Sequence, residues 1–238
     1  PLEIQREIAK TLDTVSEILA MRKQQIAELD NLIKSIFYDM FGDPVINEKG
    51  WTVYSLRDIA RVETGSTPSR NNPKYYINGN IPWVKTGEID YGYIKDTEER
   101  ITEEALNETN CKVLPKGTVL MAMYGQGKTR GKVGLLCIEA ATNQACAAII
   151  TTDKCNPEFL YRHFDLRYDE LRFLGRGGNQ PNINLSIVKK ILVPLPPIKN
   201  QDKFVRIINE IEEHKKNIRM VSKETQQLFN SLMSRYFD

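Results

Sequence analysis

Apolar residues recur every three or four positions at both ends of the chain, with charged residues between them. Near the N-terminus this stripe comprises Ile8, Leu12, Val15, Leu19, Ile26, Leu29, Ile33, Ile36 and Met40. Near the C-terminus it comprises Phe204, Ile208, Ile211, Ile218, Val221, Leu228, Leu232 and Tyr236. Steps of three and four over about five heptads are typical of a coiled-coil seam. The pattern predicts two amphipathic helices, each roughly 55–60 Å long at 1.5 Å per residue.

The two stripes belong to one stretch that occurs twice. At a constant offset of 196 residues, Pro1 aligns with Pro197 and Gln5 with Gln201, and no gap is needed up to Phe41. Proline suits the first position of a helix, where its missing N–H has no helical partner to lose. An antiparallel pair is the simplest arrangement, because one helix ends where the middle of the chain begins and the other starts where it ends. Packing of both helices on the side of one compact domain is the alternative.

The middle of the chain has a different pattern, with short apolar runs bounded by glycine, proline and asparagine. Such runs favour short strands joined by turns. We expect strands at residues 75–77, 81–84, 117–124, 132–138, 145–151 and 187–195, and helices at 102–107 and 158–174. Asn78-Gly79 predicts a hairpin between the first two strands, and Pro82 places the second at a sheet edge.

These patterns together predict an α+β protein. A mixed, mostly antiparallel domain is expected over residues 44–196, because the strands pair locally and do not alternate regularly with helices. The helices over 1–43 and 197–238 are expected to form an antiparallel coiled coil.

Composition excludes several classes of protein. The 238 residues are 41% hydrophobic and 27% charged, which is typical of a domain with a real core. No apolar run approaches the roughly 20 residues that cross a bilayer, and no signal-peptide pattern is present. Four cysteines without C-x-x-C spacing and two histidines offer few zinc ligands, so reduced cysteines in a cytoplasmic protein are expected.

The formal charge is only +2, but its distribution is uneven. Residues 64–87, 109–138 and 171–201 contain lysine and arginine and no acidic residue. Acid-free basic stretches in a balanced chain indicate a surface for a polyanion. Solvated loops are the alternative interpretation.

Two motifs resemble catalytic or cofactor sites. Residues Ala122–Thr129 nearly fit a phosphate-binding P-loop, which needs a helix directly after it. The glycines and strand-like apolar residues that follow argue against that helix. Asn156-Pro157-Glu158-Phe159 resembles the Asn-Pro-Pro-Phe/Tyr motif of amino-methyltransferases without its second proline, and a helix start capped by Asn156 explains it.

Two further loops join glycines to side chains that contact nucleic acids. Residues 124–132 and 175–182 are rich in Gly, Gln, Asn, Arg and Lys, which contact base edges and phosphates. The candidate DNA-binding residues from these loops are Tyr124, Gln126, Lys128, Thr129, Arg130, Lys132, Arg176, Asn179 and Gln180. The alternative is that both loops are merely flexible.

Several motifs occur in order along the chain and carry a resemblance to a known family. They are Gly65–Ser69, Ile81–Val84 with Thr86-Gly87, Thr118–Tyr124, Thr129–Val133, Asn143–Cys146, Gly177–Gln180 and Pro194–Pro197 with Gln201. In these motifs the sequence resembles the DNA-specificity (S) subunits of type I restriction-modification enzymes. That family has two target-recognition domains separated by long conserved helices. Here one such domain lies between two helices, so we expect a half-length subunit or a fragment.

The resemblance implies a non-catalytic subunit that reads one half of a split target in double-stranded DNA. Its helices would set the spacing between recognition domains and dock methyltransferase subunits, with a restriction/translocase subunit as a further partner and self-association through the helices. S-adenosylmethionine, ATP and Mg would be used only by partner subunits. Further candidate DNA contacts are Ser66, Thr67, Ser69, Arg70 and Lys85. A nucleotide-dependent enzyme using Ala122–Thr129 and a protein-binding coiled-coil scaffold are the alternatives.

Overall fold

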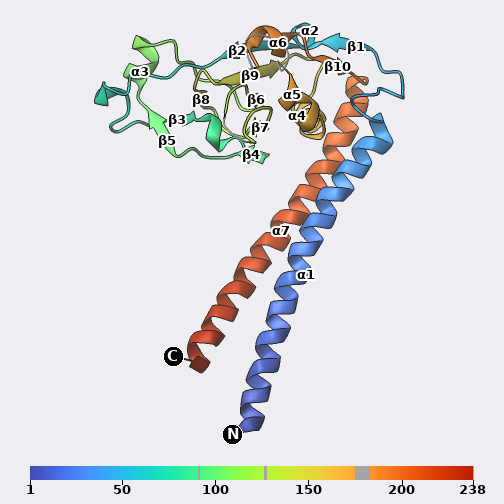
Figure 1. Cartoon of the computed structure of the whole chain (residues 1–238), viewed down its shortest axis with the longest axis vertical. Coiled ribbons are helices and arrows are strands. Elements are labelled where there is room, and N and C mark those ends of the chain that lie inside the picture. The colour runs from blue at the N-terminus through green and yellow to red at the C-terminus, as the bar shows by residue number, and fades with distance from the viewer. Residues whose placement is uncertain (91, 126–127, 175–182, 238) are drawn as a thin grey trace. The chain divides into compact units, whose positions relative to one another are not determined.

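The structure is a computed structural model that describes residues 1–90, 92–125, 128–174 and 183–237 (Figure 1). The chain divides into two compact units. A helical unit combines Pro1–Met40 with Lys203–Asp238, and a sheet unit comprises Phe41–Asp202.

The helical unit consists of two helices of equal length. Helix α1 (Leu2–Phe41) and helix α7 (Ile198–Phe237) each contain 40 residues and start at equivalent positions of the repeat. The two helices run in opposite directions (Figure 1). The predicted antiparallel pair of long helices is therefore confirmed.

Contacts between the helices follow the antiparallel order. The rings of Phe37 and Phe204 meet edge to face with centroids 5.5 Å apart. Further along, the Lys215 ammonium donates to the Asp30 carboxylate at 2.5 Å. Residue numbers fall on α1 as they rise on α7, which is the arrangement that an antiparallel pair requires.

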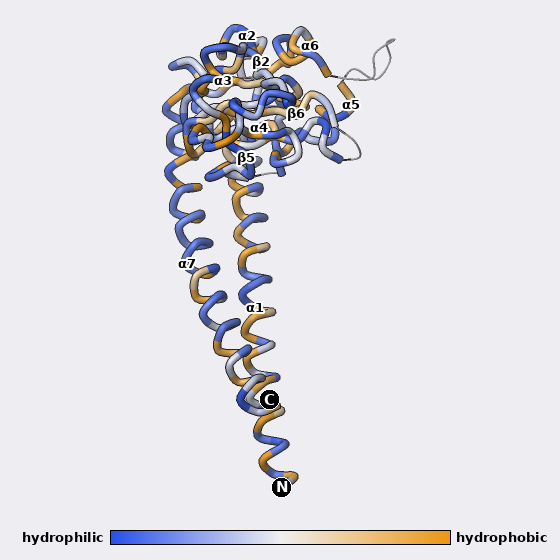
Figure 2. The backbone as a smooth tube through the Cα atoms, turned by 90° about the vertical axis from the view of Figure 1, so that its left-hand side faces the viewer, coloured by the Kyte–Doolittle hydropathy of each residue, from blue (hydrophilic) through white to orange (hydrophobic). Residues whose placement is uncertain are grey.

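Shielded positions recur in steps of three and four residues on both helices, as expected for a coiled-coil seam. On α1 they include Ile8, Leu12, Val15, Leu19, Arg22, Ile26, Leu29, Ile33, Ile36 and Met40. On α7 they include Phe204, Ile208, Ile211, Lys215, Ile218, Ser222, Thr225, Phe229 and Leu232. Figure 2 shows hydrophobic bands that recur along both helices.

The predicted stripe is wrong at three positions of α7. Val221, Leu228 and Tyr236 are 38%, 54% and 38% exposed. The heptad continues from Ile218 in steps of four and three, so that Thr225 lies in the seam instead. A polar seam suits this end of the helix, because the Arg22 side chain of α1 donates there to Thr225 and, at 2.9 Å, to the Val221 carbonyl oxygen.

The described residues of the sheet unit form three small sheets. The largest has the strand order β2-β9-β6-β7-β4, the second has the order β5-β3-β8, and β1 pairs with β10. The strands are β1 (Val53–Ser55), β2 (Ala60–Thr64), β3 (Ile81–Val84), β4 (Gly92–Ile94), β5 (Glu99–Ile101), β6 (Val119–Ala122), β7 (Val133–Leu136), β8 (Ala141–Thr142), β9 (Cys146–Thr151) and β10 (Leu192–Pro194). Among these strands five of seven pairings are antiparallel, as predicted.

Short helices complete the sheet unit. They are α2 (Leu56–Ile59), η1 (Pro73–Tyr75), η2 (Thr86–Glu88), α3 (Glu103–Glu108), α4 (Pro157–Leu166), α5 (Tyr168–Phe173) and α6 (Leu185–Lys189). Helix α4 begins as predicted, with Pro157 in its first turn and the Asn156 side chain accepting from the Glu158 amide at 3.0 Å. The core lies around β6 and β7, whose residues are all buried.

Three local predictions are wrong. The expected strand at 75–77 is replaced by η1 and a turn in which Asn78 has a φ of 58°. The expected helix at 158–174 breaks at Arg167, which separates α4 from α5. The first three residues of the expected strand at 187–195 belong to α6, because the Asn184 side chain caps that helix by accepting from the Ile187 amide.

Strand β3 is the middle strand of its sheet, although Pro82 predicted an edge. Pro82 pairs with Arg100 of β5 on one side. On the other side, the pairing with β8 begins only at Trp83. The missing N–H of Pro82 therefore falls outside the ladder between β3 and β8, which removes the usual cost of a central proline.

Candidate nucleic-acid interface

Several of the motifs that carry the family resemblance meet at one place in the sheet unit. A β-carbon on Gly65 would lie 1.9 Å from the Thr142 carbonyl oxygen, so only glycine fits there. The next residue, Ser66, donates its amide to the same oxygen at 3.0 Å and accepts from the Trp83 indole at 3.1 Å. These motif residues therefore join β2, β3 and β8.

A second set of hydrogen bonds strengthens this junction. The Thr67 hydroxyl donates to the Gln144 side chain, and the Thr86 hydroxyl donates to the Asn143 side chain at 3.0 Å. The Ser66 carbonyl and the Thr67 hydroxyl, both from predicted DNA contacts, thus have partners within the protein. Ser69 lies nearby and is exposed.

Arg70 and Lys85, two further predicted contacts, are held by the same carboxylate. One oxygen of Glu99 accepts from Arg70 at 2.5 Å and the other lies 3.0 Å from the Lys85 ammonium. Lys85 also donates to Glu98 at 2.8 Å. The hydrogen bond from Arg70 lowers the pKa of Glu99, and the bond to Glu98 raises the pKa of Lys85.

Aromatic rings hold the other side of Arg70. Its guanidinium carbon lies 4.6 Å from the centroid of the Tyr76 ring and 5.1 Å from that of Trp83. The two rings meet at an angle of 74°, and the Tyr76 hydroxyl donates to the Pro68 carbonyl oxygen at 2.6 Å. Arg70 is therefore fixed by aromatic faces as well as by Glu99.

A second cluster forms where the loop before β7 meets α5. Gly131 has a φ of 83°, and a β-carbon there would lie 2.8 Å from the Arg172 amide nitrogen. The Tyr168 hydroxyl donates to the Lys128 carbonyl oxygen at 2.6 Å, and the Arg172 guanidinium lies 5.5 Å from the Tyr168 ring centroid. The backbone of the loop thus packs closely on α5, whose Tyr168 and Arg172 side chains lie together.

The other predicted residues of this loop lie close by. Tyr124 is 37% exposed, and the Thr129 carbonyl oxygen accepts from the Lys132 amide at 3.1 Å. The Lys132 ammonium pairs with Asp90 at 2.5 Å. Gln126, Arg176, Asn179 and Gln180 lie outside the residues that the structure describes.

Folding weakens the charge argument made from the sequence. Carboxylates from other parts of the chain pair with cations of the acid-free stretches, as Asp90 does with Lys132 and Glu99 with Arg70. A stretch without acids along the chain is therefore not a surface without acids.

Helix α5 was missed as a candidate site. Tyr168 and Arg172 contact the loop described above, and Phe173 is 51% exposed. The available signal was one basic residue, Arg172, close to the aromatic residues Tyr168 and Phe173. Two acidic residues in the same helix masked that signal.

The phosphate-binding interpretation of Ala122–Thr129 does not fit the fold. Strand β6 ends at Ala122, and after the loop the chain continues as β7, which pairs antiparallel with β6. A P-loop requires a helix whose N-terminus faces the phosphates. In this structure strand β7, and not a helix, follows the loop.

The described residues offer little for catalysis or metal binding. No three His, Cys, Asp or Glu side chains among them gather as a metal site. Burial raises the pKa of the Cys146 thiol to about 11 and that of Cys155 to about 12, so neither is a thiolate at neutral pH. In the described parts of the chain no helix is long and apolar enough to cross a membrane.

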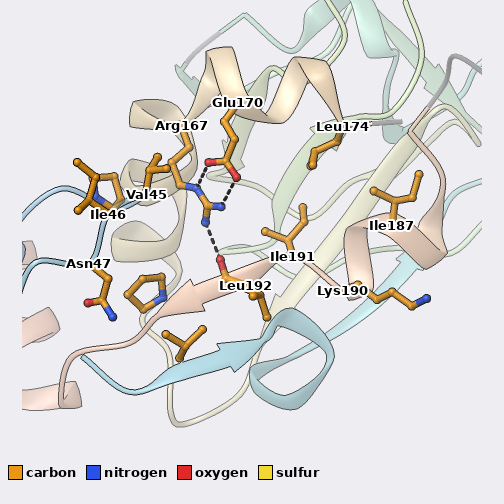
Figure 3. A pocket seen from close by; sticks show the side chains of 13 residues that line it. Val45, Ile46, Asn47, Arg167, Glu170, Leu174, Ile187, Lys190, Ile191 and Leu192 are labelled. Atoms are coloured by element: carbon orange, nitrogen blue, oxygen red, sulfur yellow. Dashed lines mark hydrogen bonds and ion pairs between the residues drawn. The ribbon is translucent and has the colours of Figure 1, made fainter. Parts of the chain in front are cut away.

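A groove of about 640 Å³ lies between α5, α6 and β10 (Figure 3). The Arg167 guanidinium inside it makes two bonds of 2.7 Å to Glu170 and one of 2.7 Å to the Leu192 carbonyl oxygen. Behind it, Arg167 donates to the Nε2 atom of His163 at 2.9 Å. Burial, followed by the charge of Arg167, holds the pKa of His163 well below its usual value. These polar groups satisfy one another and tie α4 and α5 to β10.

The described geometry thus has two clusters with basic and aromatic side chains. Comparison with known proteins agrees with this picture. Residues 48–227 match the model of the type I restriction modification DNA specificity domain. The chain belongs to this family.

Relatives in the specificity-domain family are longer than this chain. It is 30% identical over 195 residues to the MjaIX type I restriction enzyme specificity subunit of Methanocaldococcus jannaschii, which covers 77% of this chain and 44% of that protein. It is 26% identical over 218 residues to the EcoR124I/EcoR124II specificity subunit of Escherichia coli, which covers 89% of this chain and 52% of that protein. The chain therefore spans about half the length of these relatives.

Solved structures support the fold. The HsdS subunit from Thermoanaerobacter tengcongensis matches 99% of this chain and 57% of its own, with a TM-score of 0.64 at 17% identity. The S subunit from M. genitalium matches 98% of this chain and 60% of its own, with a TM-score of 0.66 at 14% identity. At these identities the likeness concerns the fold alone, and it supports the predicted α+β class.

Proposed function

We propose that this chain is the DNA-recognition part of a type I restriction-modification complex, and that its sheet unit reads one half of a split target. The match of the specificity-domain model to residues 48–227 carries this proposal. The two basic and aromatic clusters of the sheet unit support it, because such side chains contact phosphates and stack on bases.

The proposed contacts divide by chemistry. Lys128, Arg130 and Lys132 contact phosphates, and Gln126 and Gln180 read base edges. The other proposed contacts are Ser66, Thr67, Ser69, Arg70, Lys85, Tyr124, Thr129, Arg176 and Asn179. Tyr168 and Arg172 join this set because they adjoin the Lys128 loop.

The helical unit is the proposed spacer and docking element. Forty residues at 1.5 Å give a helix of about 60 Å, which limits the spacing to at most roughly 18 base pairs at 3.4 Å each. The outer faces of the helices dock methyltransferase subunits, and a restriction/translocase subunit joins the complex. Val221 and Leu228, exposed on α7, are candidate contacts for a partner or for a second copy of this chain.

In this proposal the chain catalyses nothing by itself and works in the cytoplasm. S-adenosylmethionine, ATP and Mg act in partner subunits. The described fold supports this view, because β7 takes the place of a P-loop helix and the Asn156 motif serves as a helix cap.

Binding to duplex DNA with and without ATP tests the proposal against its alternatives. A DNA-recognition subunit binds duplex equally well in both conditions. ATP-dependent binding would indicate a nucleotide-dependent protein, and absence of binding would indicate a protein scaffold. Methyl transfer should appear only when a cognate modification subunit and S-adenosylmethionine are added, so transfer by the chain alone would contradict the proposal.

Salt dependence tests the phosphate contacts. Replacing Lys128 and Arg130 by alanine should reduce the slope of log affinity against log salt by about two, because each lost phosphate contact removes about one unit. Lys112→Ala is a matched control, because Lys112 is a basic residue of the same unit that lies 4.0 Å from Glu63. An unchanged slope in the double variant would remove both residues from the interface.

A further inference from the structure

Arg70 is held in a way that differs from a flexible surface cation. Its guanidinium faces Tyr76 and Trp83, and its Nη1 atom donates to Glu99 at 2.5 Å. Trp83 is itself only 1% exposed, so this platform belongs to the core of the unit. A guanidinium fixed on three sides has already lost most of the conformational freedom that binding would otherwise remove.

The fixed guanidinium still has donors to offer. The Arg70 side chain is 51% exposed. Within the part of the chain that the structure describes, its Nε and Nη2 groups donate no hydrogen bond. A planar fork with two available donors matches the paired O6 and N7 acceptors of guanine in the major groove.

The charge around Arg70 favours a base over a phosphate. Arg70 and Lys85 face the carboxylates of Glu98 and Glu99, so the formal charge of the cluster is zero. A phosphate would meet two carboxylates as well as two cations. A guanine edge is uncharged and meets no such repulsion.

We propose that Arg70 reads a guanine in the major groove, and that Glu99 is the positioning residue that orients its guanidinium. Glu99 acts from β5, where its backbone pairs with that of Trp83. Glu99 thus pairs through its backbone with Trp83 and through its carboxylate with Arg70. This inference rests on the proposed DNA-reading function and adds the base and the residue that orients its reader.

Selection of bound duplexes from a randomised pool tests the inference, using the whole chain together with its modification subunits. Arg70→Lys keeps the charge and loses the fork. It should leave overall affinity within about threefold and reduce the preference for guanine at one position by roughly tenfold or more. Glu99→Gln should relax the same position and no other, which a merely structural role would not produce.

Arg61 and Glu63 provide the matched control. They form an ion pair of 3.6 Å on β2 of the same unit, in which the Arg61 side chain is exposed. Arg61→Lys and Glu63→Gln should change no base preference. Thermal unfolding of every variant separates loss of the fold from loss of base reading, and Arg70→Lys serves as the test if Glu99→Gln unfolds.

Each remaining outcome overturns the inference. An equal loss of affinity for all sequences would make Arg70 a phosphate contact. Unchanged selection in both variants would make the cluster a purely structural link between β3 and β5. If the unaltered protein selects no sequence, the proposed DNA-reading function fails first, and the role of Arg70 falls with it.

Discussion

Gln5 and Gln201 occupy the same position in the two copies of the repeated helix, and their surroundings are opposite. Gln201 is fully buried, whereas Gln5 is exposed. The Gln201 side chain accepts from the Asn156 amide at 2.8 Å and donates to the carbonyl oxygens of Lys154 and Pro196 at 3.1 and 2.7 Å. Gln201, which belongs to the sheet unit, therefore ties the first turn of α7 to its neighbours within that unit, whereas Gln5 meets solvent.

The seam of the helical unit shows a second difference between the copies. Lys215 of α7 is only 4% exposed and pairs with Asp30 and Glu212, while its counterpart in the repeat is Leu19. Arg22 of α1 also lies in the seam, and its counterpart is Ile218. A polar side chain at a seam position specifies register at some cost in stability. The two copies thus share a fold and differ in which seam positions are polar.

The largest contrast is expected at Phe204 and its counterpart Ile8. Phe204 is fully buried against Phe37, so Phe204→Ala should lower the free energy of unfolding by about 3–5 kcal/mol. Ile8 is half-buried, and Ile8→Ala should cost about 1 kcal/mol. Urea unfolding followed by helical circular dichroism measures both values. Equal losses would mean that the two ends of the helical unit are equally well packed.

The next contrast tests the anchoring glutamine. Gln201→Ala leaves a buried amide and two carbonyl oxygens without their partner, and should cost about 2–3 kcal/mol. Gln5→Ala is the matched control and should change stability by less than about 0.5 kcal/mol. Both tryptophans, Trp51 and Trp83, lie in the sheet unit, so their fluorescence reports its unfolding. A cost below about 0.5 kcal/mol at Gln201 would contradict the anchoring role.

Acid should lower the stability of the sheet unit, which contains His163. His163 has a lowered pKa in the folded protein, so below about pH 6.5 the unfolded chain binds a proton that the folded chain does not. The free energy of unfolding should therefore fall as the pH falls, by up to about 1.4 kcal/mol per pH unit.

Tryptophan fluorescence at pH 5 to 8 measures this dependence. His163→Phe should flatten it, and Gln5→Ala should leave it unchanged. A pH dependence that survives in His163→Phe would assign the acid sensitivity to other groups.

The smallest effect on stability is expected when Asp30 and Lys215, which pair in the seam, are replaced by the residues at the equivalent positions of the other copy. Asp30 and Lys215 correspond in the repeat to Gln226 and Leu19. The double change Asp30→Gln with Lys215→Leu should be neutral or stabilising by about 1 kcal/mol, because the ion pairs of the buried Lys215 ammonium repay little of the cost of its desolvation.

Asp30→Gln alone provides the comparison for this layer. It should destabilise by about 1 kcal/mol, because the buried Lys215 ammonium loses its ion pair with Asp30 and keeps the one with Glu212. Equal unfolding midpoints for the single and double variants would show that the buried ammonium carries no such cost.

The predictable features were the local ones. The heptad stripe and the proline at each start predicted both long helices, and Asn156-Pro157 predicted the start of α4, because caps and periodicity act within a few residues. The two strands that became β6 and β7 were predicted as well, from their apolar runs at 117–124 and 132–138. Several motif residues of the candidate site were also visible as Gly65–Thr67 and Asn143-Gln144.

Pairing between distant segments was decided by tertiary structure. Pro82 predicted an edge strand, and only the late start of β8 made a central position acceptable. In the sequence, Arg70 and Lys85 lie in a stretch without acidic residues. In the structure, Arg70 pairs with Glu99 and Lys85 pairs with Glu98. Along the seam of α7, the register with α1 selected Thr225 over the more apolar Leu228.

Periodicity, caps and the repeat by themselves determined two long helices, one before and one after a mixed domain in the sequence. Each of these signals is complete within a short segment. Tertiary structure decided which copy of a repeated residue is buried, which cations meet a carboxylate and where Arg70 is held. Those outcomes depend on contacts between residues far apart in the chain. Gln5 and Gln201 show the reason, because identical side chains in matching helices differ only in what the rest of the fold brings to them.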